Sequence, residues 1–281
     1  MEAQLEQIRE QQKESWNKFS PGWKKWDDLT MDFLKPMGDE IIRQLKPKDG
    51  ELILDVAAGT GEPGMTIAEM IPKGKVIITD LSDGMLKVAN ENIKKRGLKN
   101  VEIKACDVSE LPFPDNTFDA ISCRMGFMFF PDMQLAANEM ARVLKPGGRV
   151  ATSVWATAER NFWITVMSDT INRNMKLPPP PPGAPSLFRC AQPGLIQELF
   201  KNAGLKHTRE MDVKGQINPQ SVDTYWNMMM DVAAPLVYAM SNADEAIKVN
   251  IKKEIYQQLN ERFPDGKVNF ECNAIVIYGE K

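Results

Sequence analysis

Three carboxylates, each placed where a predicted strand ends, are the residues of this sequence best suited to binding chemistry. Asp55 lies in the apolar run 51–57, Asp80 ends the run 75–80, and Asp107 follows the run 101–106. Open α/β sheets bind ligands at the carboxyl ends of their strands, so three acids in these positions predict one shared site. Asp80 can accept hydrogen bonds from both hydroxyls of a ribose, and Asp107 can accept one from an adenine amino group. The pattern therefore indicates a nucleoside site.

A glycine turn, LILDVAAGTGEPG at 52–64, follows the first of these strands. Gly59 and Gly61 allow the backbone to pass close to a ligand where a Cβ would collide. The spacing also matches the dinucleotide fingerprint, so by itself it leaves NAD and S-adenosylmethionine open. Glu62 is expected near the N-terminus of the next helix, where it would repel a pyrophosphate but tolerate a zwitterionic sulfonium. Asp55 could take the α-amino group of a bound amino acid, directly or through water.

Strands and helices are predicted to alternate from residue 49 to 155, which indicates βαβ units and a parallel sheet with helices on both faces. The later strands and a long helical region complete the chain, and the proline run 178–182 predicts an extended connection. The predicted strands are 51–57, 75–80, 101–106, 118–123, 149–155, 205–214 and 269–278. The predicted helices are 1–19, 31–45, 63–71, 82–96, 134–144, 156–175, 195–203 and most of 221–263.

Composition narrows the function classes. The chain has 281 residues and a net charge of −3, with basic and acidic residues interleaved, so nucleic acid is not an expected partner. One histidine, His207, and four well-separated cysteines provide no expected metal site. The charged N-terminus lacks the apolar core of a signal peptide, and no apolar run is long enough to span a bilayer. We therefore expect a cytoplasmic protein, with a homodimer as one option for its oligomeric state.

The segments LDVAAGTGEPG, ITDLSDGML, CDVSELPFPDNTFDAISCR and ARVLKPGGRV together resemble the class I S-adenosylmethionine-dependent methyltransferases. The resemblance covers residues 49–155 and is strongest to the branch of ubiquinone and menaquinone C-methyltransferases. It implies a Rossmann-like, mostly parallel sheet of seven strands whose last strand is antiparallel, with S-adenosylmethionine as cofactor and S-adenosylhomocysteine as product.

The resemblance also implies roles for individual residues. Asp80 matches the ribose-binding acid, Asp107 and Val108 match the adenine contacts, and Arg124 lies in the segment that passes the methionine portion and faces the acceptor. Ala57 stands where many members have the first glycine. The expected cofactor-binding residues are Asp55, Ala57, Gly59, Thr60, Gly61, Asp80, Leu81, Met85, Cys106, Asp107, Val108, Cys123 and Arg124.

One segment departs from the quinone branch. Those enzymes carry an Arg-Asn pair shortly after the fourth strand, where this chain has Gly126-Phe127-Met128-Phe129-Phe130. The polar pair is thought to help activate the quinol ring, so its replacement places a quinone acceptor in doubt.

We expect instead a small-molecule acceptor that is apolar or aromatic, bound in a pocket with flexible methionine and aromatic walls. Methyl transfer from a sulfonium is an in-line displacement, for which positioning can suffice. No catalytic residue is assigned, because His207 is expected at the start of its strand, away from the carboxyl edge that carries the cofactor. Three alternatives stay open: an NAD-dependent oxidoreductase, a nucleic-acid methyltransferase and a non-enzymatic S-adenosylmethionine-binding protein. The expected acceptor-binding residues are Trp16, Phe19, Trp23, Phe127, Met128, Trp155, Tyr225 and Met229.

Three regions are expected. Residues 1–48 form an N-terminal helical cap. Residues 49–216 and 266–281 form the Rossmann-like core. Residues 217–265 form a helical insert over the acceptor site.

Overall fold

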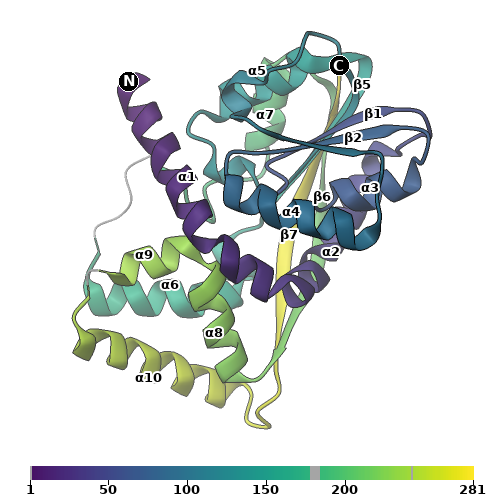
Figure 1. Ribbon diagram of the computed structural model, residues 1–281. Helices are drawn as coiled ribbons and strands as arrows, with labels where there is room; N and C mark the ends of the chain where they lie inside the picture. Colours follow the sequence, from purple (N-terminus) through teal and green to yellow (C-terminus); the bar gives the residue numbers. More distant parts are fainter. Residues whose placement is uncertain (1, 178–183, 242) are drawn as a thin grey trace.

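The computed structural model describes residues 2–177, 184–241 and 243–281, and the proline run 178–182 lies outside them. Seven strands form one sheet in the order β3-β2-β1-β4-β5-β7-β6 (Figure 1). Strands β1 to β5 pair in parallel, and β7 pairs antiparallel with both β5 and β6. The predicted sheet with its antiparallel last strand is thus confirmed. The strands are β1 Leu52–Val56, β2 Lys75–Asp80, β3 Val101–Ala105, β4 Phe118–Arg124, β5 Leu144–Trp155, β6 Lys206–Gln220 and β7 Val268–Glu280.

The central strands are buried on both faces, as expected when helices cover a parallel sheet on each side. In β1 and β2, the residues 53–56 and 76–79 are all buried despite the alternating direction of their side chains. Helices α5 and α7 pack on each other, and α2 packs on four strands of the sheet. The α-helices of the sheet region are α2 Asp27–Leu45, α3 Gly64–Met70, α4 Asp83–Arg96, α5 Met133–Val143 and α7 Leu195–Asn202.

Helix α4 begins and ends as its sequence predicts. The Ser82 hydroxyl accepts a hydrogen bond from Met85 N at 3.1 Å, which satisfies a backbone donor of the first turn. At the other end Gly97 has a φ of 70°, the left-handed conformation that glycine adopts without strain. The helix is therefore fixed directly behind Asp80, which ends the preceding strand.

The first helix is longer than predicted. Helix α1 spans Glu2–Lys25 and continues through Pro21, where the sequence had predicted its end. A proline removes the hydrogen bond to the carbonyl four residues earlier, here that of Asn17. The Ser20 hydroxyl donates to this carbonyl at 2.9 Å and replaces the missing bond.

The C-terminal half of the molecule is dominated by a long hairpin and the helices that pack near its far end (Figure 1). Strand β6 extends to Gln220, six residues beyond the prediction, and the helices of the predicted insert begin only at Val222. The predicted helix 156–175 is a short 3-10 turn, Ala158–Arg160, followed by α6 Phe162–Met175. The remaining helices are α8 Val222–Val232, α9 Ala234–Ser241 and α10 Glu245–Arg262, and α6 packs against α10 and α9.

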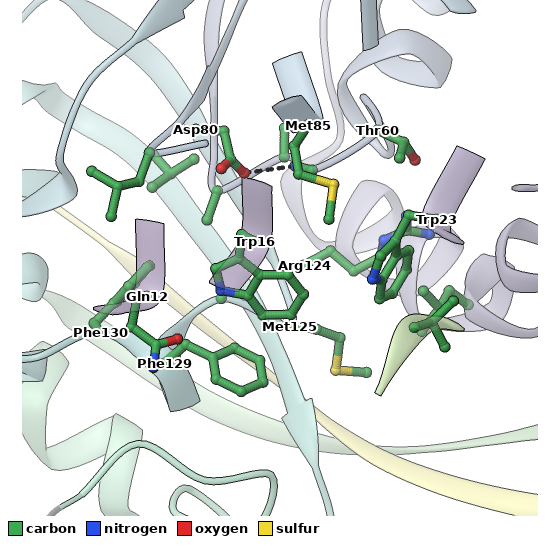
Figure 2. Close-up of a pocket in the computed structure, with 18 of the residues that line it drawn as sticks. Gln12, Trp16, Trp23, Thr60, Asp80, Met85, Arg124, Met125, Phe129 and Phe130 are labelled. Carbon is green, nitrogen blue, oxygen red and sulfur yellow. Dashed lines mark hydrogen bonds between the residues drawn. The ribbon is translucent and has the colours of Figure 1, made fainter. Parts of the chain in front are cut away.

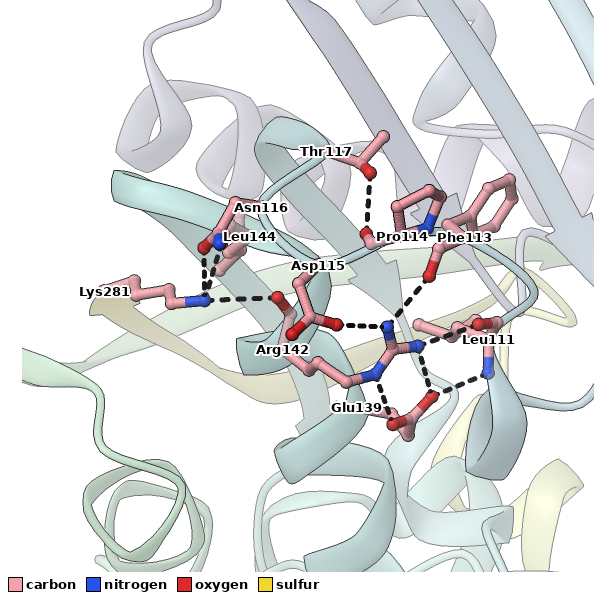
Figure 3. A network of polar contacts seen from close by, with 10 residues as sticks. All are labelled: Leu111, Phe113, Pro114, Asp115, Asn116, Thr117, Glu139, Arg142, Leu144 and Lys281. Atoms are coloured by element: carbon pink, nitrogen blue, oxygen red, sulfur yellow. Dashed lines mark hydrogen bonds and ion pairs between the residues drawn. The ribbon is translucent and has the colours of Figure 1, made fainter.

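A polar network holds the connection between β3 and β4 against α5 (Figure 3). All five N–H groups of the Arg142 guanidinium are used: they donate to both Glu139 carboxylate oxygens, to Asp115, and to the carbonyls of Leu111 and Phe113 at 2.7–2.8 Å. Glu139 also accepts from Leu111 N at 2.8 Å. This connection carries Val108 and so positions one wall of the site described below.

None of the helices in the described part of the chain is both long and apolar enough to cross a membrane.

Candidate active site

A pocket opens at the carboxyl edge of the sheet, where the strand-end acids were expected to meet (Figure 2). Ten of the thirteen expected cofactor-binding residues line it. Three do not: Asp55, Gly61 and Cys123. The ten are Ala57, Gly59, Thr60, Asp80, Leu81, Met85, Cys106, Asp107, Val108 and Arg124.

Asp80 is held in a fixed orientation by the backbone. Its Oδ2 accepts from Gly59 N at 2.9 Å and its Oδ1 accepts from Ser82 N at 2.8 Å. Each carboxylate oxygen can accept a second hydrogen bond, so both remain able to receive hydroxyl donors. Burial raises the pKa of Asp80, and these backbone donors oppose the rise because they favour the charged form.

The glycine turn leaves room beside Asp80. Gly59 has a φ of 57°, and a Cβ built on it would meet no atom within 4 Å, so a side chain here would project into open space at the pocket wall. Ala57 has a φ of 51°, a left-handed conformation that glycine adopts more readily than alanine. The turn and Asp80 together fit a ribose with its attached groups.

Asp55 is placed differently from the prediction. It is fully buried beneath the turn, where its two carboxylate oxygens accept from Gly64 N at 2.8 Å and Ser122 Oγ at 2.6 Å. Burial raises the pKa of Asp55 to about 7. Its side chain therefore braces the turn and is not exposed to the pocket. Cys123 is likewise buried below the pocket floor.

The adenine end of the expected site is covered by α1. Asp107 Oδ1 accepts from Ser109 N at 2.7 Å, and its other oxygen forms an ion pair with Arg9 of α1. Sequence reasoning missed Arg9, because its role depends on how α1 packs on the sheet rather than on a motif. Next to Asp107, Cys106 lines the pocket, and burial raises the pKa of its thiol to about 11, so the thiol is neutral.

Glu62 lies just before α3, as the sequence predicts, and also lines the pocket. Its carboxylate accepts from Thr66 N and Thr66 Oγ1 at 3.2 and 3.0 Å and forms an ion pair with Arg96 at 2.5 Å. The carboxylate is therefore already paired within the protein and binds α3 to α4.

The other half of the pocket, which we call the acceptor half, is apolar. We define it as the apolar part of the lining, beside the strand-end residues and the glycine turn. Trp16 is central in Figure 2 and makes an edge-on contact with Phe129, with ring centroids 5.1 Å apart. The acceptor half consists of Trp16, Trp23, Met31, Phe33, Leu34, Met125, Gly126, Phe129, Phe130, Pro131, Trp155, Trp163, Ile164, Leu187, Met228, Met229, Val232, Ala233 and Pro235.

Four of the eight expected acceptor-binding residues line the pocket: Trp16, Trp23, Trp155 and Met229. The other four, Phe19, Phe127, Met128 and Tyr225, do not. Phe127 and Met128 are fully buried, and the ring of Phe127 packs on Phe130 and Phe200. Tyr225 is also buried, with its hydroxyl donating to Trp163 O. The structure places Phe127, Met128 and Tyr225 in the core because one face of each element turns inward, which composition alone does not reveal.

His207 is exposed at the start of β6 and is not among the pocket residues. Within the described ranges, no group of three or more His, Cys, Asp and Glu side chains is arranged to hold a metal ion.

Comparison with solved structures places this pocket in a known fold. The chain matches a structure described as an S-adenosylmethionine-dependent methyltransferase from Aquifex aeolicus, at 26% identity and a TM-score of 0.53, over 69% of this chain and 92% of that one. It matches a putative methyltransferase from Bacillus halodurans at 21% identity and a TM-score of 0.58, over 87% and 98% of the two chains. The chain has the fold of the class I S-adenosylmethionine-dependent methyltransferases.

Within this methyltransferase fold, residues 27–163 match the profile of the ubiE/COQ5 methyltransferase family. A demethylmenaquinone methyltransferase from Geobacillus stearothermophilus is 40% identical over 110 residues, which are 39% of this chain and 47% of that protein. The chain thus spans about half the length of the curated relatives that it matches. The similarity lies in the methyltransferase core that carries the glycine turn and the strand-end acids.

Proposed function

We propose that this protein transfers a methyl group from S-adenosylmethionine to an apolar or aromatic small molecule. The observation that carries the proposal is the division of one pocket into two halves. Asp80 and the glycine turn form a polar half suited to a ribose, and it adjoins the apolar acceptor half. A nucleoside-linked donor and an apolar acceptor would meet where the two halves join.

The bound donor would supply an electrophilic methyl group and a neutral thioether leaving group. No residue has to protonate this leaving group, so the protein's contribution is to hold the acceptor in line and exclude water. Among the described residues, the carboxylates that line the pocket, those of Glu62, Asp80 and Asp107, are hydrogen-bonded within the protein, and we assign none of them as a base. The acceptor would therefore arrive already nucleophilic, for example as a phenolate or an enolate.

The names of the curated relatives suggest a first acceptor to try. These relatives are named demethylmenaquinone methyltransferases, and a demethylmenaquinol is both aromatic and apolar. In the segment 126–130, which differs from the polar pair of the quinone branch, Phe127 and Met128 are buried away from the pocket. An acceptor screen should therefore include this quinol beside unrelated phenols, thiols and amines, with release of S-adenosylhomocysteine as the measurement.

The assignment of the methyl donor can be tested before the acceptor is known. Calorimetry should detect S-adenosylhomocysteine binding to the wild type and no binding of NAD. Asp80→Ala should weaken the S-adenosylhomocysteine affinity at least tenfold, about 1.4 kcal/mol, because it removes the acceptors for the ribose hydroxyls. Asp80→Asn retains the shape of the side chain and should weaken binding as well. Asp83→Ala, which removes an exposed carboxylate on α4, is the matched control and should bind like the wild type. Binding of NAD alone would overturn the proposal.

A further inference from the structure

The indole N–H of Trp23 is a buried donor without an acceptor. Trp23 lines the acceptor half, and its Nε1 is enclosed yet has no hydrogen-bond partner among the described residues. The N–H is the only polar group of an indole, and buried tryptophans usually find a partner for it. Two other tryptophans do so: Trp26 Nε1 donates to Asp231 Oδ2 at 2.8 Å, and Trp163 Nε1 donates to Asn161 Oδ1 at 3.2 Å. A buried donor left unpaired costs free energy, so a ligand that brings an acceptor to Trp23 would gain by binding there.

The other buried donors without a partner lie elsewhere. Arg149 and Arg189 each have such an Nε, but neither residue lines the pocket, and each donates through its other nitrogens. The Nε of Arg9 lies against Asp107, with which it forms an ion pair at the polar end of the pocket. Among the described residues, Trp23 is thus the one whose unpartnered side-chain donor belongs to the acceptor half.

The indole of Trp23 is held in place from several sides. Trp16 and Trp23 are about two turns apart on α1 and so lie on the same face of the helix, with ring centroids 6.3 Å apart (Figure 2). Just before Trp23, Gly22 lies against the backbone of α8 at Asp231. Just after it, Lys25 Nζ donates to the carboxylate of Asp231 at 2.7 Å. A donor that is already fixed loses little conformational entropy when it binds a ligand.

We propose that Trp23 donates a hydrogen bond to an oxygen of the methyl acceptor and so selects aromatic acceptors that carry a hydroxyl or carbonyl oxygen on the ring. This inference rests on the proposed function and narrows its acceptor class. The apolar side chains of the acceptor half would contact any flat ring of suitable size alike. A site built to bond an oxygen discriminates against the analogue that lacks it, because the buried donor is then left unpaired. Trp23 binds and orients the acceptor and takes no part in proton transfer.

Two probes that differ in one substituent test this inference. 2-Naphthol carries a hydroxyl oxygen, and 2-methylnaphthalene has the same rings with a methyl group of similar size in its place. Both are titrated by calorimetry into protein saturated with S-adenosylhomocysteine. Trp23→Phe retains an aromatic ring without the N–H donor, so it should weaken 2-naphthol binding about 5- to 10-fold more than 2-methylnaphthalene binding. Comparing the two losses removes the effect of the smaller ring, because both probes experience it.

The matched control is Trp226→Phe, which makes the same change in a tryptophan that packs on Tyr256 and does not line the pocket. It should weaken the binding of neither probe. A second measurement observes the donor directly, by NMR of protein with isotope-labelled tryptophan. The indole N–H signal that is missing from Trp23→Phe should move further downfield with 2-naphthol than with 2-methylnaphthalene.

The possible outcomes separate this inference from the proposed function. If Trp23→Phe weakens both probes equally, or weakens neither, Trp23 is only an aromatic wall and the inference is overturned, while the donor assignment stands. If S-adenosylhomocysteine binds and neither probe does, the inference falls together with the aromatic acceptor class. If the wild type does not bind S-adenosylhomocysteine, the proposed function itself fails. Retained 2-methylnaphthalene binding shows that the variant is folded.

Discussion

At the scale of single residues, Asp55 and Asp80 lie at the carboxyl ends of neighbouring strands but have different roles. Asp80 faces the pocket with spare acceptor capacity, whereas Asp55 is enclosed and accepts only from within the protein. Both positions are visible in the sequence as an acid at a strand end. The difference between them arises because the turn that follows β1 folds over Asp55, whose carboxylate accepts from Gly64 N at its end.

Because the carboxyl of Asp55 is buried, we expect it to affect how the stability of the protein depends on pH. Its pKa is raised to about 7 by burial, while in the unfolded chain it would be about 3.9. Between these values the folded protein binds more protons than the unfolded chain, so this group lowers the free energy of unfolding as pH rises from 4 to 7. Asp55→Asn removes the effect. The stability of the variant relative to wild type should therefore increase by about 1–3 kcal/mol between pH 5 and pH 8.

Urea unfolding of both proteins at the two pH values measures this difference. In the difference in unfolding free energy between variant and wild type, the contributions of groups that titrate alike in both proteins cancel. Asp83→Asn, an exposed carboxyl on α4, is the control and should show no comparable pH dependence. If the stability of Asp55→Asn relative to wild type were equal at pH 5 and pH 8, the pKa of the buried Asp55 carboxyl could not be raised as described.

At the scale of elements, periodicity located every strand of the sheet, since apolar runs between turn signals are a local property of the chain. The ends of elements were less predictable where distant groups decide them. Helix α1 passes Pro21 because Ser20 satisfies the exposed carbonyl, and β6 lengthens to Gln220 because β7 pairs with it that far. The same distinction applies to the site. Ten of the thirteen predicted cofactor residues line the pocket, because the positions of strand ends and turns are set by the local sequence. Phe127 and Met128 turn inward instead, because their orientation depends on packing against the rest of the fold.

The network around Arg142 gives the element-scale prediction. Arg142→Met should lower the free energy of unfolding by about 1–3 kcal/mol at pH 7, because five hydrogen bonds to the β3–β4 connection and to Glu139 are lost (Figure 3). Hydrogen bonding to Arg142 lowers the pKa of Glu139, so this part of the stability is lost as pH falls through the pKa of the folded state. The difference between variant and wild type should accordingly be smaller at pH 3 than at pH 7.

Urea unfolding at pH 7 and pH 3 provides the measurement. The control is Lys35→Met, which breaks an exposed pair with Asp39 on α2 and should cost less than about 0.5 kcal/mol. If the two variants lose similar stability at pH 7, the network does not support the connection as described.

At the scale of the whole molecule, α1 is the element that joins the two halves of the pocket. It packs on α4 of the sheet region and on α8 of the C-terminal helical region, and Figure 1 shows it running between them. On the α4 side, Asn17 Oδ1 accepts from Ser82 Oγ at 2.8 Å and from Gly84 N at 2.9 Å. On the α8 side, Lys25 Nζ donates to Asp231 Oδ2 at 2.7 Å, and Trp26 Nε1, directly after α1, donates to the same oxygen at 2.8 Å. The sequence predicted a helical cap, but its contact with both ends of the pocket is a tertiary feature that no local pattern encodes.

This arrangement depends on Gly22 of α1, which lies against the backbone of α8 at Asp231. A Cβ built on Gly22 would lie 1.9 Å from the backbone oxygen of Asp231, so Gly22→Ala must push the two helices apart. Hydrogen exchange of the α1 amides should then be at least tenfold faster, corresponding to about 1.4 kcal/mol of local stability, while amides of β1, β2 and β4 keep their protection. Gly38→Ala on α2 is the matched control, because its built Cβ has no neighbour nearer than 3.7 Å, and it should leave α1 exchange unchanged. Unchanged α1 exchange in Gly22→Ala would mean that α1 is held by α4 alone and that α8 does not secure it over the pocket.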